Sequence, residues 1–173
     1  MSENRNSGIR RFNAWLIVAF FIVLADQATK WAIVEWVPLY GKVPINAYIN
    51  LTHQQNMGAA FSFLAGASGW QRWFFVVLAT VVSAVITVWI WRIRNEGPYI
   101  LAVGLALVLG GAIGNLIDRI RFGYVTDFIQ VWFGDWAFPS FNVADSAISV
   151  GAALLVIDAL FVSGRQTKTG SEP

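Results

Sequence analysis

Four long apolar runs, separated by polar segments, dominate the pattern of the chain. They cover approximately residues 13–36, 73–91, 99–116 and 142–162. Each is close to the roughly 20 apolar residues that an α-helix needs to cross the hydrocarbon core of a bilayer. The second run has no charged residue and carries Trp near both ends, as is typical of helix ends at a membrane interface. We therefore predict an all-α membrane core of four transmembrane helices, with residues 1–173 forming one integral membrane domain.

The first apolar run follows a polar, Arg-containing start, a layout that signal peptides share. It continues past Asp26 and Lys30, however, and no small-residue cleavage site ends it. We interpret it as a retained helix. Asp26 and Lys30 are four residues apart, so we expect them to pair on one face of this helix.

Residues 37–69 are too polar, and too often interrupted by Pro and Gly, to span a membrane. The alternation of apolar and polar residues in VPINAYINLTH is typical of short strands. We predict a small β platform here, between the first two helices and outside the membrane. Within it, residues 54–63 (QQNMGAAFSF) suit a loop packed against the helices. The polar tail from Ser163 is predicted to be disordered.

Four crossings place both termini on the same side of the membrane. Cytoplasmic segments are enriched in Lys and Arg, so the distribution of these residues predicts the orientation. The side of the termini holds Arg5, Arg10, Arg11, Arg92, Arg94, Arg165 and Lys168, whereas the other side holds Lys42, Arg72, Arg119 and Arg121. We expect cytoplasmic termini, and a β platform and Asp127 loop that face outward.

Composition supports a membrane protein and narrows the chemistry. The chain is 57% hydrophobic and 13% charged, whereas soluble domains carry about a quarter charged residues. A net charge of +2, without a basic block, argues against a nucleic-acid partner. There is no Cys, and His53 is the only His. Cysteine nucleophiles are thereby excluded, and zinc hydrolases and serine triads are disfavoured.

Polar side chains gather between residues 110 and 145, at the boundary of the last two helices. Ionisable groups at the edge of a hydrocarbon layer are costly and usually mark a functional site. Asp127 lies in a predicted turn that leads back to the last helix, and Asp145 lies near the start of that helix. Asn142 is a suitable N-cap, with Asp145 at the third helical position. The segment carries Asn115, Asp118, Arg119, Asp127, Asn142 and Asp145.

The residues alone leave two interpretations of this segment. Asp127 and Asp145 can form a paired-carboxylate site, because both can reach the same interface. Alternatively, Asp145 only caps a helix and Asp127 is a solvated loop acid. Asp158 lies about 20 Å along the helix from Asp145, too far to join such a pair. We expect local pairing or capping from Asp118, a polar platform role for His53, and solvated acids at Glu35 and Asp135.

Five motifs in order carry a resemblance to a known family. The chain resembles bacterial lipoprotein signal peptidase, also called signal peptidase II, an intramembrane aspartyl protease of the inner membrane. The motifs are DQATK at 26–30, NMGAAF at 56–61, GGAIGNLIDR at 110–119, VTDF at 125–128 and FNVAD at 141–145.

The resemblance implies roles for the residues at the motif positions. Asp127 and Asp145 match the catalytic dyad of the family. The family's pocket-lining residues correspond to Asn56, Asn115 and Arg119 of this chain. An amide near the dyad of the family corresponds to Asn142. The family also has a polar pair that supports the fold and the pocket, and this pair corresponds to Asp26 and Lys30.

The same resemblance implies the reaction and its partners. The family cuts prolipoproteins on the N-terminal side of a Cys that already bears a diacylglyceryl group. Membrane lipid is the surrounding partner, and cyclic lipopeptides of the globomycin type are inhibitors. The resemblance implies neither a cofactor nor a metal, and we expect a monomer.

Elementary chemistry is consistent with an aspartyl dyad. Two carboxylates held close together cannot both ionise readily, so the pair shares a proton and titrates as a unit. The ionised member can take a proton from water while the protonated member polarises the scissile carbonyl. Arg119, always charged, offers a donor fork for peptide or lipid oxygens.

Two other classes of function compete with a protease. A small transporter or channel subunit would use Asp26, Lys30, Asp118 and Asp145 as a polar relay. An assembly factor would bind a partner through the β platform. Relay residues of a transporter belong at the middle of the membrane on facing helices. Most acids here cluster at one boundary, which favours the protease.

Overall fold

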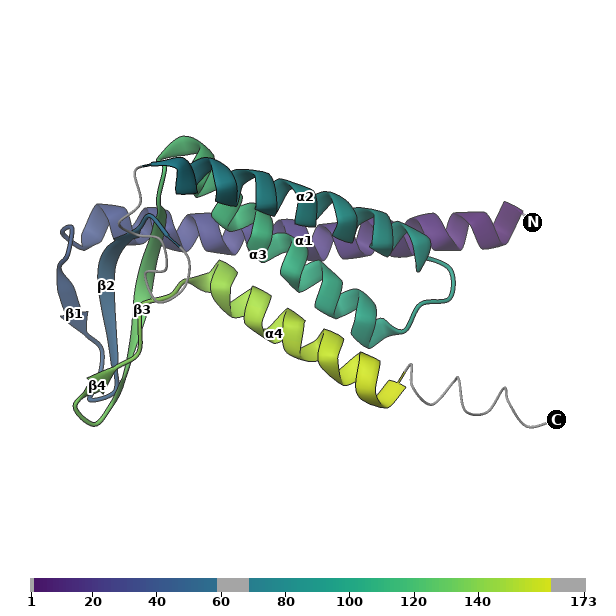
Figure 1. Cartoon of the computed structure of the whole chain (residues 1–173). Coiled ribbons are helices and arrows are strands. Elements are labelled where there is room, and N and C mark those ends of the chain that lie inside the picture. The colour runs from purple at the N-terminus through teal and green to yellow at the C-terminus, as the bar shows by residue number, and fades with distance from the viewer. Residues whose placement is uncertain (1, 59–68, 163–173) are drawn as a thin grey trace.

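The computed structural model describes residues 2–58 and 69–162, which form a helical bundle with a small sheet at one end (Figure 1). Within these residues, four helices are long and apolar enough to cross a membrane, which confirms the predicted core. Beyond α4 the chain continues into a short π-helical segment, Asp158–Val162. The helices are α1 (Ser2–Trp36), α2 (Trp70–Arg92), α3 (Tyr99–Arg121) and α4 (Val143–Ile157).

Helix α1 begins at Ser2, earlier than the apolar run that starts near residue 13. Tertiary contacts hold part of this polar extension. Arg11 donates hydrogen bonds of 3.0 and 2.8 Å to the carbonyls of Asn95 and Gly97, in the connection between α2 and α3. The Phe12 ring packs edge-on against Trp91 at 5.0 Å. The start of α1 therefore reaches the end of the bundle opposite the sheet.

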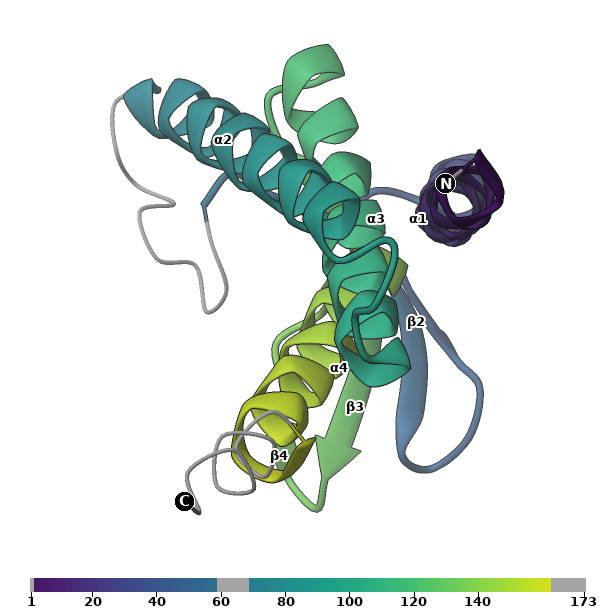
Figure 2. The same ribbon diagram turned by 90° about the vertical axis from the view of Figure 1, so that its right-hand side faces the viewer.

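Helix α3 is the centre of the bundle, and it packs against α1, α2 and α4 (Figure 2). Leu105 and Leu109 are fully buried and form a core with Ile90 of α2. Small residues let α3 and α4 approach closely. A Cβ added at Gly151 would lie 2.7 Å from the carbonyl oxygen of Gly104, too close for any side chain. The outer faces expose large apolar residues, as a lipid-facing surface requires: Phe20, Phe21, Val77, Val81, Val85 and Leu160.

The polar part of α3 extends further than the predicted helix end near Leu116. The helix continues to Arg121. Asp118 and Arg119 lie in this extension, and both are buried because they face other parts of the protein. Their partners lie on α1 and near the end of β2, which is why local sequence signals misplace this boundary.

The sheet is antiparallel, with the order β1-β2-β3-β4. Strands β1 (Lys42–Pro44) and β2 (Ile49–Asn56) come from the predicted platform. Strands β3 (Val125–Phe133) and β4 (Trp136–Ala137) come from the connection between α3 and α4. The predicted β platform is therefore confirmed, but the prediction includes only half of its strands, because the other half come from a distant segment.

The pairing of β2 with β3 corrects two local predictions. Asp127 lies in strand β3, opposite Gln54, and not in a turn. Gln54 and Asn56 belong to strand β2, and not to a loop. Each strand gains its conformation from the other, so neither half shows a strong signal alone. The rest of the predicted loop, residues 59–63, and the tail from Ser163 lie outside the described residues.

Candidate active site

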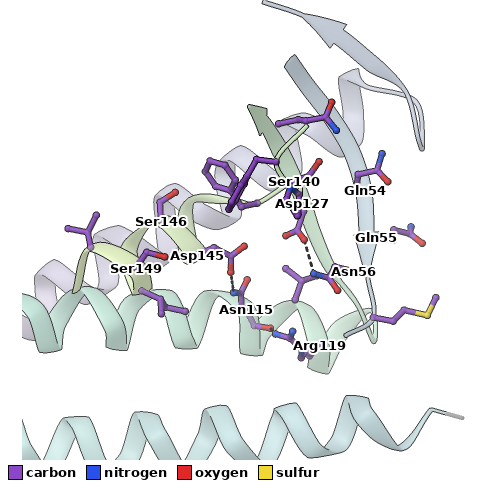
Figure 3. A pocket seen from close by; sticks show the side chains of 18 residues that line it. Gln54, Gln55, Asn56, Asn115, Arg119, Asp127, Ser140, Asp145, Ser146 and Ser149 are labelled. Atoms are coloured by element: carbon purple, nitrogen blue, oxygen red, sulfur yellow. Dashed lines mark hydrogen bonds between the residues drawn. The ribbon is translucent and has the colours of Figure 1, made fainter. Parts of the chain in front are cut away.

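Asp127 and Asp145 face a common space at the junction of the sheet and the bundle (Figure 3). Strand β3 carries Asp127, and the first turn of α4 carries Asp145. Asn142 contacts both carboxylates. Its side-chain Nδ2 donates to Asp127 Oδ1 at 2.7 Å, and its backbone N–H donates to Asp145 Oδ2 at 3.2 Å. One residue thus holds the two acids beside each other.

The start of α4 explains how Asp145 is oriented. Asn142 is the N-cap, and its side-chain oxygen accepts a hydrogen bond of 2.8 Å from the Asp145 backbone. The predicted N-cap role of Asn142 is confirmed, and the return contact from the Asp145 carboxylate completes a capping box. Capping is not the only role of Asp145, because Asn115 Nδ2 donates to its Oδ1 at 2.8 Å and its side chain lines the cavity.

Two further amides border the acids. Asn56, at the end of β2, donates from Nδ2 to Asp127 Oδ2 at 2.9 Å. Its own oxygen accepts from the Gly58 backbone at 3.0 Å, which orients the amide. Asn115, on α3, contacts Asp145 as described above and also receives a 3.3 Å contact from Asn142. The structure therefore brings together both predicted acids and all three predicted Asn residues.

Arg119 lies at the side of the cavity but is 9% exposed and well held. Its Nη2 donates to the Gly58 carbonyl at 2.9 Å, and its guanidinium lies 4.9 Å from the centre of the Phe75 ring. The sequence gives no indication of this contact, because an apolar residue on a membrane helix such as Phe75 carries no sign of a cation–π role. Arg119 therefore lines the cavity and also binds the chain segment that follows β2.

The cavity in front of the acids has a volume of about 990 Å³. One part of its wall is polar and holds the acids. Another part contains apolar residues and extends along α4 away from the sheet, where Ser146 and Ser149 lie among them. Such a cleft suits a ligand with a polar reacting centre and an apolar extension. Wall residues include Asn56, Asn115, Arg119, Asp127 and Asp145 on the polar part, and Phe138, Phe141, Ile148 and Val150 on the apolar part.

Burial changes the acidity of Asp127, which is only 4% exposed. Desolvation, followed by the nearby charge of Asp145, raises the pKa of Asp127 to about 7. Hydrogen bonds from Asn56 and Asn142 lower this pKa, as does the positive charge of Lys30, but their effect is smaller. At neutral pH Asp127 therefore holds its proton for a large part of the time, and an acid and a base can coexist here.

Behind the acids lies a buried group of three charges. Lys30 Nζ is 2.8 Å from Asp26 Oδ2 and 2.9 Å from Asp118 Oδ2. The predicted pairing of Asp26 with Lys30 is confirmed. Asp118 was expected to pair locally or to cap its helix, which is wrong, because its partner comes from α1. Gln27 also joins this group by donating to Asp118 Oδ1 at 2.8 Å, although the sequence motif that contains it assigns it no role.

The remaining polar candidates lie away from the cavity. Asp158 is 3% exposed and lies beyond the far end of α4. Glu35 and Asp135 are exposed, as predicted. His53 is buried in the sheet region, where Nδ1 is 2.9 Å from the Val37 carbonyl. None of these residues lines the cavity described above.

Comparison with known proteins places this chain in one family. A family described as "Signal peptidase (SPase) II" matches residues 18–161. The chain belongs to the signal peptidase II family. The lipoprotein signal peptidase of Pseudomonas putida is 54% identical over 84% of this chain and 85% of its own length. That of Pseudomonas syringae pv. tomato is 49% identical over 90% of each chain.

Solved structures support the same family fold. One, described as a bacterial membrane enzyme obtained by the in meso method, is 28% identical and has a TM-score of 0.78 over 93% of both chains. A second of the same description is 29% identical, with a TM-score of 0.75 over 87% of this chain and 95% of the other. The chain is accordingly a multi-pass membrane protease of aspartic type that removes signal peptides from prolipoproteins. Signal peptidase II membership decides between the protease and the two alternatives, a transporter subunit and an assembly factor.

Proposed function

We propose that Asp127 and Asp145 are the catalytic dyad with which this signal peptidase cleaves diacylglyceryl-modified prolipoproteins, on the N-terminal side of the lipidated Cys. One observation carries this assignment. Asn142 contacts both carboxylates, although they come from a strand and a helix. Both acids also line the same cavity, together with the amides of Asn56 and Asn115.

The two acids play different roles in the proposed reaction. Asp127, with its raised pKa, holds the shared proton and donates a hydrogen bond to the scissile carbonyl. Asp145 is the ionised member and accepts a proton from the attacking water. The water oxygen bonds to the carbonyl carbon, and the carbonyl oxygen takes the proton of Asp127. Collapse of this intermediate breaks the C–N bond. The leaving amine receives the proton held by Asp145, and one hydroxyl of the intermediate returns its proton to Asp127, which restores the starting protonation of the pair.

The apolar part of the cavity suits the lipid on the substrate. Ile148 and Val150 extend this wall along α4, away from the sheet. Burial of acyl chains contributes about 0.8 kcal/mol per CH₂, so two chains provide more anchoring than a few peptide contacts. Cyclic lipopeptides of the globomycin type, which also combine a peptide with an acyl chain, are expected to compete for this cavity. The enzyme is proposed to act as a monomer, since the dyad and cavity come from one chain.

Replacing each dyad acid with its amide tests the assignment. Asp127→Asn and Asp145→Asn keep the side-chain volume but cannot exchange the proton. We expect each variant to lose activity by a factor of about 10² to 10⁴ or more, with non-additive losses in the double variant. The measurement is a mobility-shift assay on a diacylglyceryl-modified precursor.

Two aspartates outside the cavity supply the controls for this assay. Asp158→Asn matches the burial of Asp127, and Asp135→Asn is an exposed counterpart. Both are expected to cleave at the wild-type rate. Substantial turnover by a folded Asp127→Asn or Asp145→Asn variant contradicts the dyad.

A further inference from the structure

The buried charges behind the dyad contact the backbone directly before each catalytic acid. Asp26 Oδ1 accepts a hydrogen bond of 2.9 Å from the backbone N–H of Ala144. Asp118 Oδ2 accepts one of 3.3 Å from the backbone N–H of Thr126. Ala144 precedes Asp145, and Thr126 precedes Asp127. Two carboxylates from different helices therefore hold the two chain segments that present the dyad.

Lys30 links these two carboxylates and also reaches the dyad through an amide. Its Nζ lies within 2.9 Å of both carboxylates, and it donates to Asn115 Oδ1 at 2.9 Å. Because that oxygen faces Lys30, the Nδ2 of Asn115 faces Asp145. The cation thus sets which end of the Asn115 amide meets the catalytic carboxylate.

The packing of α1 against α3 brings the charges of Asp26, Lys30 and Asp118 close together. Gly114 lies on α3 beside Asp26, and a Cβ at this position would be 2.6 Å from Asp26 Oδ2. Asp26, Lys30 and Asp118 are 0%, 4% and 2% exposed. Burying charges costs free energy, and well-packed apolar residues often stabilise a fold equally well. A role in the reaction gives a reason for three charges at this place.

We infer that Asp26, Lys30 and Asp118 form a positioning triad, which sets the separation and orientation of the two catalytic carboxylates. The inference rests on the proposed dyad. The triad does not line the cavity, so it acts through the backbone and Asn115 and not on the substrate. Displacing a catalytic group by about 1 Å can cost about 10²-fold in rate, so such support affects turnover more than binding.

A purely structural role, in which the charges only join α1 to α3, makes a different prediction. Structural damage lowers the amount of folded enzyme but leaves the pH profile of the surviving molecules unchanged. A positioning role changes kcat in folded enzyme, and a change in triad charge also shifts the titration of Asp127. The charged groups around Asp127 are Asp145 on α4, Arg119 on α3 and Lys30 on α1.

Two substitutions of Asp118 separate charge from position. Asp118→Asn removes one anion and leaves the balanced pair of Lys30 with Asp26, so the fold is expected to survive. The charge of Lys30, no longer shared with Asp118, should then lower the pKa of Asp127 and move the alkaline limb of activity to lower pH. Asp118→Glu keeps the charge but moves the carboxylate by one CH₂. The alkaline limb of the pH profile should therefore stay at the wild-type pH while kcat falls.

The experiment measures kcat, KM and the pH profile on a diacylglyceryl-modified precursor, with folding checked by thermal unfolding in detergent. We expect kcat to fall at least about 10-fold in both variants, with KM changed less than about 3-fold. Asp158→Asn, a buried aspartate outside the site, is the matched control and should retain wild-type values.

The outcomes separate this inference from the proposed dyad. The positioning triad alone is overturned if either folded Asp118 variant keeps the wild-type kcat and pH profile while Asp127→Asn and Asp145→Asn are inactive. If Asp118→Asn does not fold, kcat of folded Asp118→Glu decides. Failure of both to fold shows a structural role and also overturns the inference. Activity in a folded dyad variant overturns the proposed function itself.

Discussion

At the scale of single residues, the site depends on amides that touch carboxylates. Asn56, Asn115 and Asn142 each donate to a dyad acid over 2.7 to 2.9 Å. Hydrogen bonds to an ionised carboxylate are stronger than neutral ones, and they stabilise the charged form. Burial and mutual repulsion act in the opposite direction. For Asp127, burial and repulsion outweigh the hydrogen bonds, so this carboxyl holds its proton for a large part of the time near neutral pH.

This balance predicts how activity depends on pH. The pKa of Asp127 is raised to about 7, so the protonated form is lost as the pH rises through that value. Both acids are then ionised, and neither can donate to the scissile carbonyl. We expect kcat/KM to fall above about pH 7 and to fall again in acid, where the second carboxylate is protonated. A pH–rate profile on lipidated precursor checks this prediction, and a flat profile from pH 6 to 9 contradicts it.

At the scale of elements, the end of α3 needs support because it carries part of the site. Arg72, in the first turn of α2, donates from Nε to the Arg119 carbonyl at 2.9 Å and from Nη2 to the Ile120 carbonyl at 2.8 Å. The last carbonyls of a helix have no partner within it, so Arg72 acts as a C-terminal cap. The same helix α2 supplies Phe75 beneath the Arg119 guanidinium.

We therefore predict that Arg72→Met destabilises the enzyme by about 1–3 kcal/mol, since it leaves these carbonyls without their charged donor. Activity should fall less than in the dyad variants, because Arg72 does not line the cavity. Thermal unfolding in detergent measures the effect. Arg92→Met, an exposed position at the other end of α2, is the control and should unfold like wild type. Equal unfolding temperatures for the two variants contradict the capping role.

At the scale of the whole molecule, the helical bundle has two ends with different contents. The start of α1 and the end of α4 lie at one end, and the sheet and the start of α4 lie at the other (Figure 1). Asp127 on β3 and Asp145 in the first turn of α4 belong to this second end. The basic residues of the sequence favour the cytoplasm for the first end. The dyad would then lie near the outer face of the membrane, and the sheet outside it.

Cysteine labelling tests this orientation, and the chain has no native Cys to interfere. Lys42 and Glu96 are exposed residues at opposite ends. In spheroplasts, a membrane-impermeant thiol reagent should modify Lys42→Cys at once and Glu96→Cys only after the membrane is opened. Immediate labelling of Glu96→Cys would reverse the proposed topology.

The position of the cavity also predicts a requirement for substrate lipid. Its wall extends along α4, whose outward face is apolar. A precursor without its diacylglyceryl group loses the anchoring of two acyl chains, so we expect kcat/KM to fall by at least about 10²-fold. Cleavage of matched precursors with and without the lipid measures this factor. Equal cleavage of the two precursors contradicts the proposed use of the apolar wall.

Local signals in the sequence determined much of this protein. The length and apolarity of four runs predict the spans, because a helix in a bilayer satisfies its own backbone hydrogen bonds. The i, i+4 spacing predicts the pairing of Asp26 with Lys30, and the N-cap pattern predicts the capping of α4 by Asn142. The ordered motifs led to the correct family. Each of these features depends on neighbours within a few residues, or on motif order alone.

Only the tertiary structure decided how distant segments meet. Asp127 lies in a strand because β3 pairs with β2, which comes from an earlier part of the chain. The partner of Asp118 is Lys30, far away on another helix. Periodicity reports the face of an element that is buried, but not which segment covers it. That choice depends on packing, register and shared burial across the whole chain, which is why the positioning triad appears only in the folded molecule.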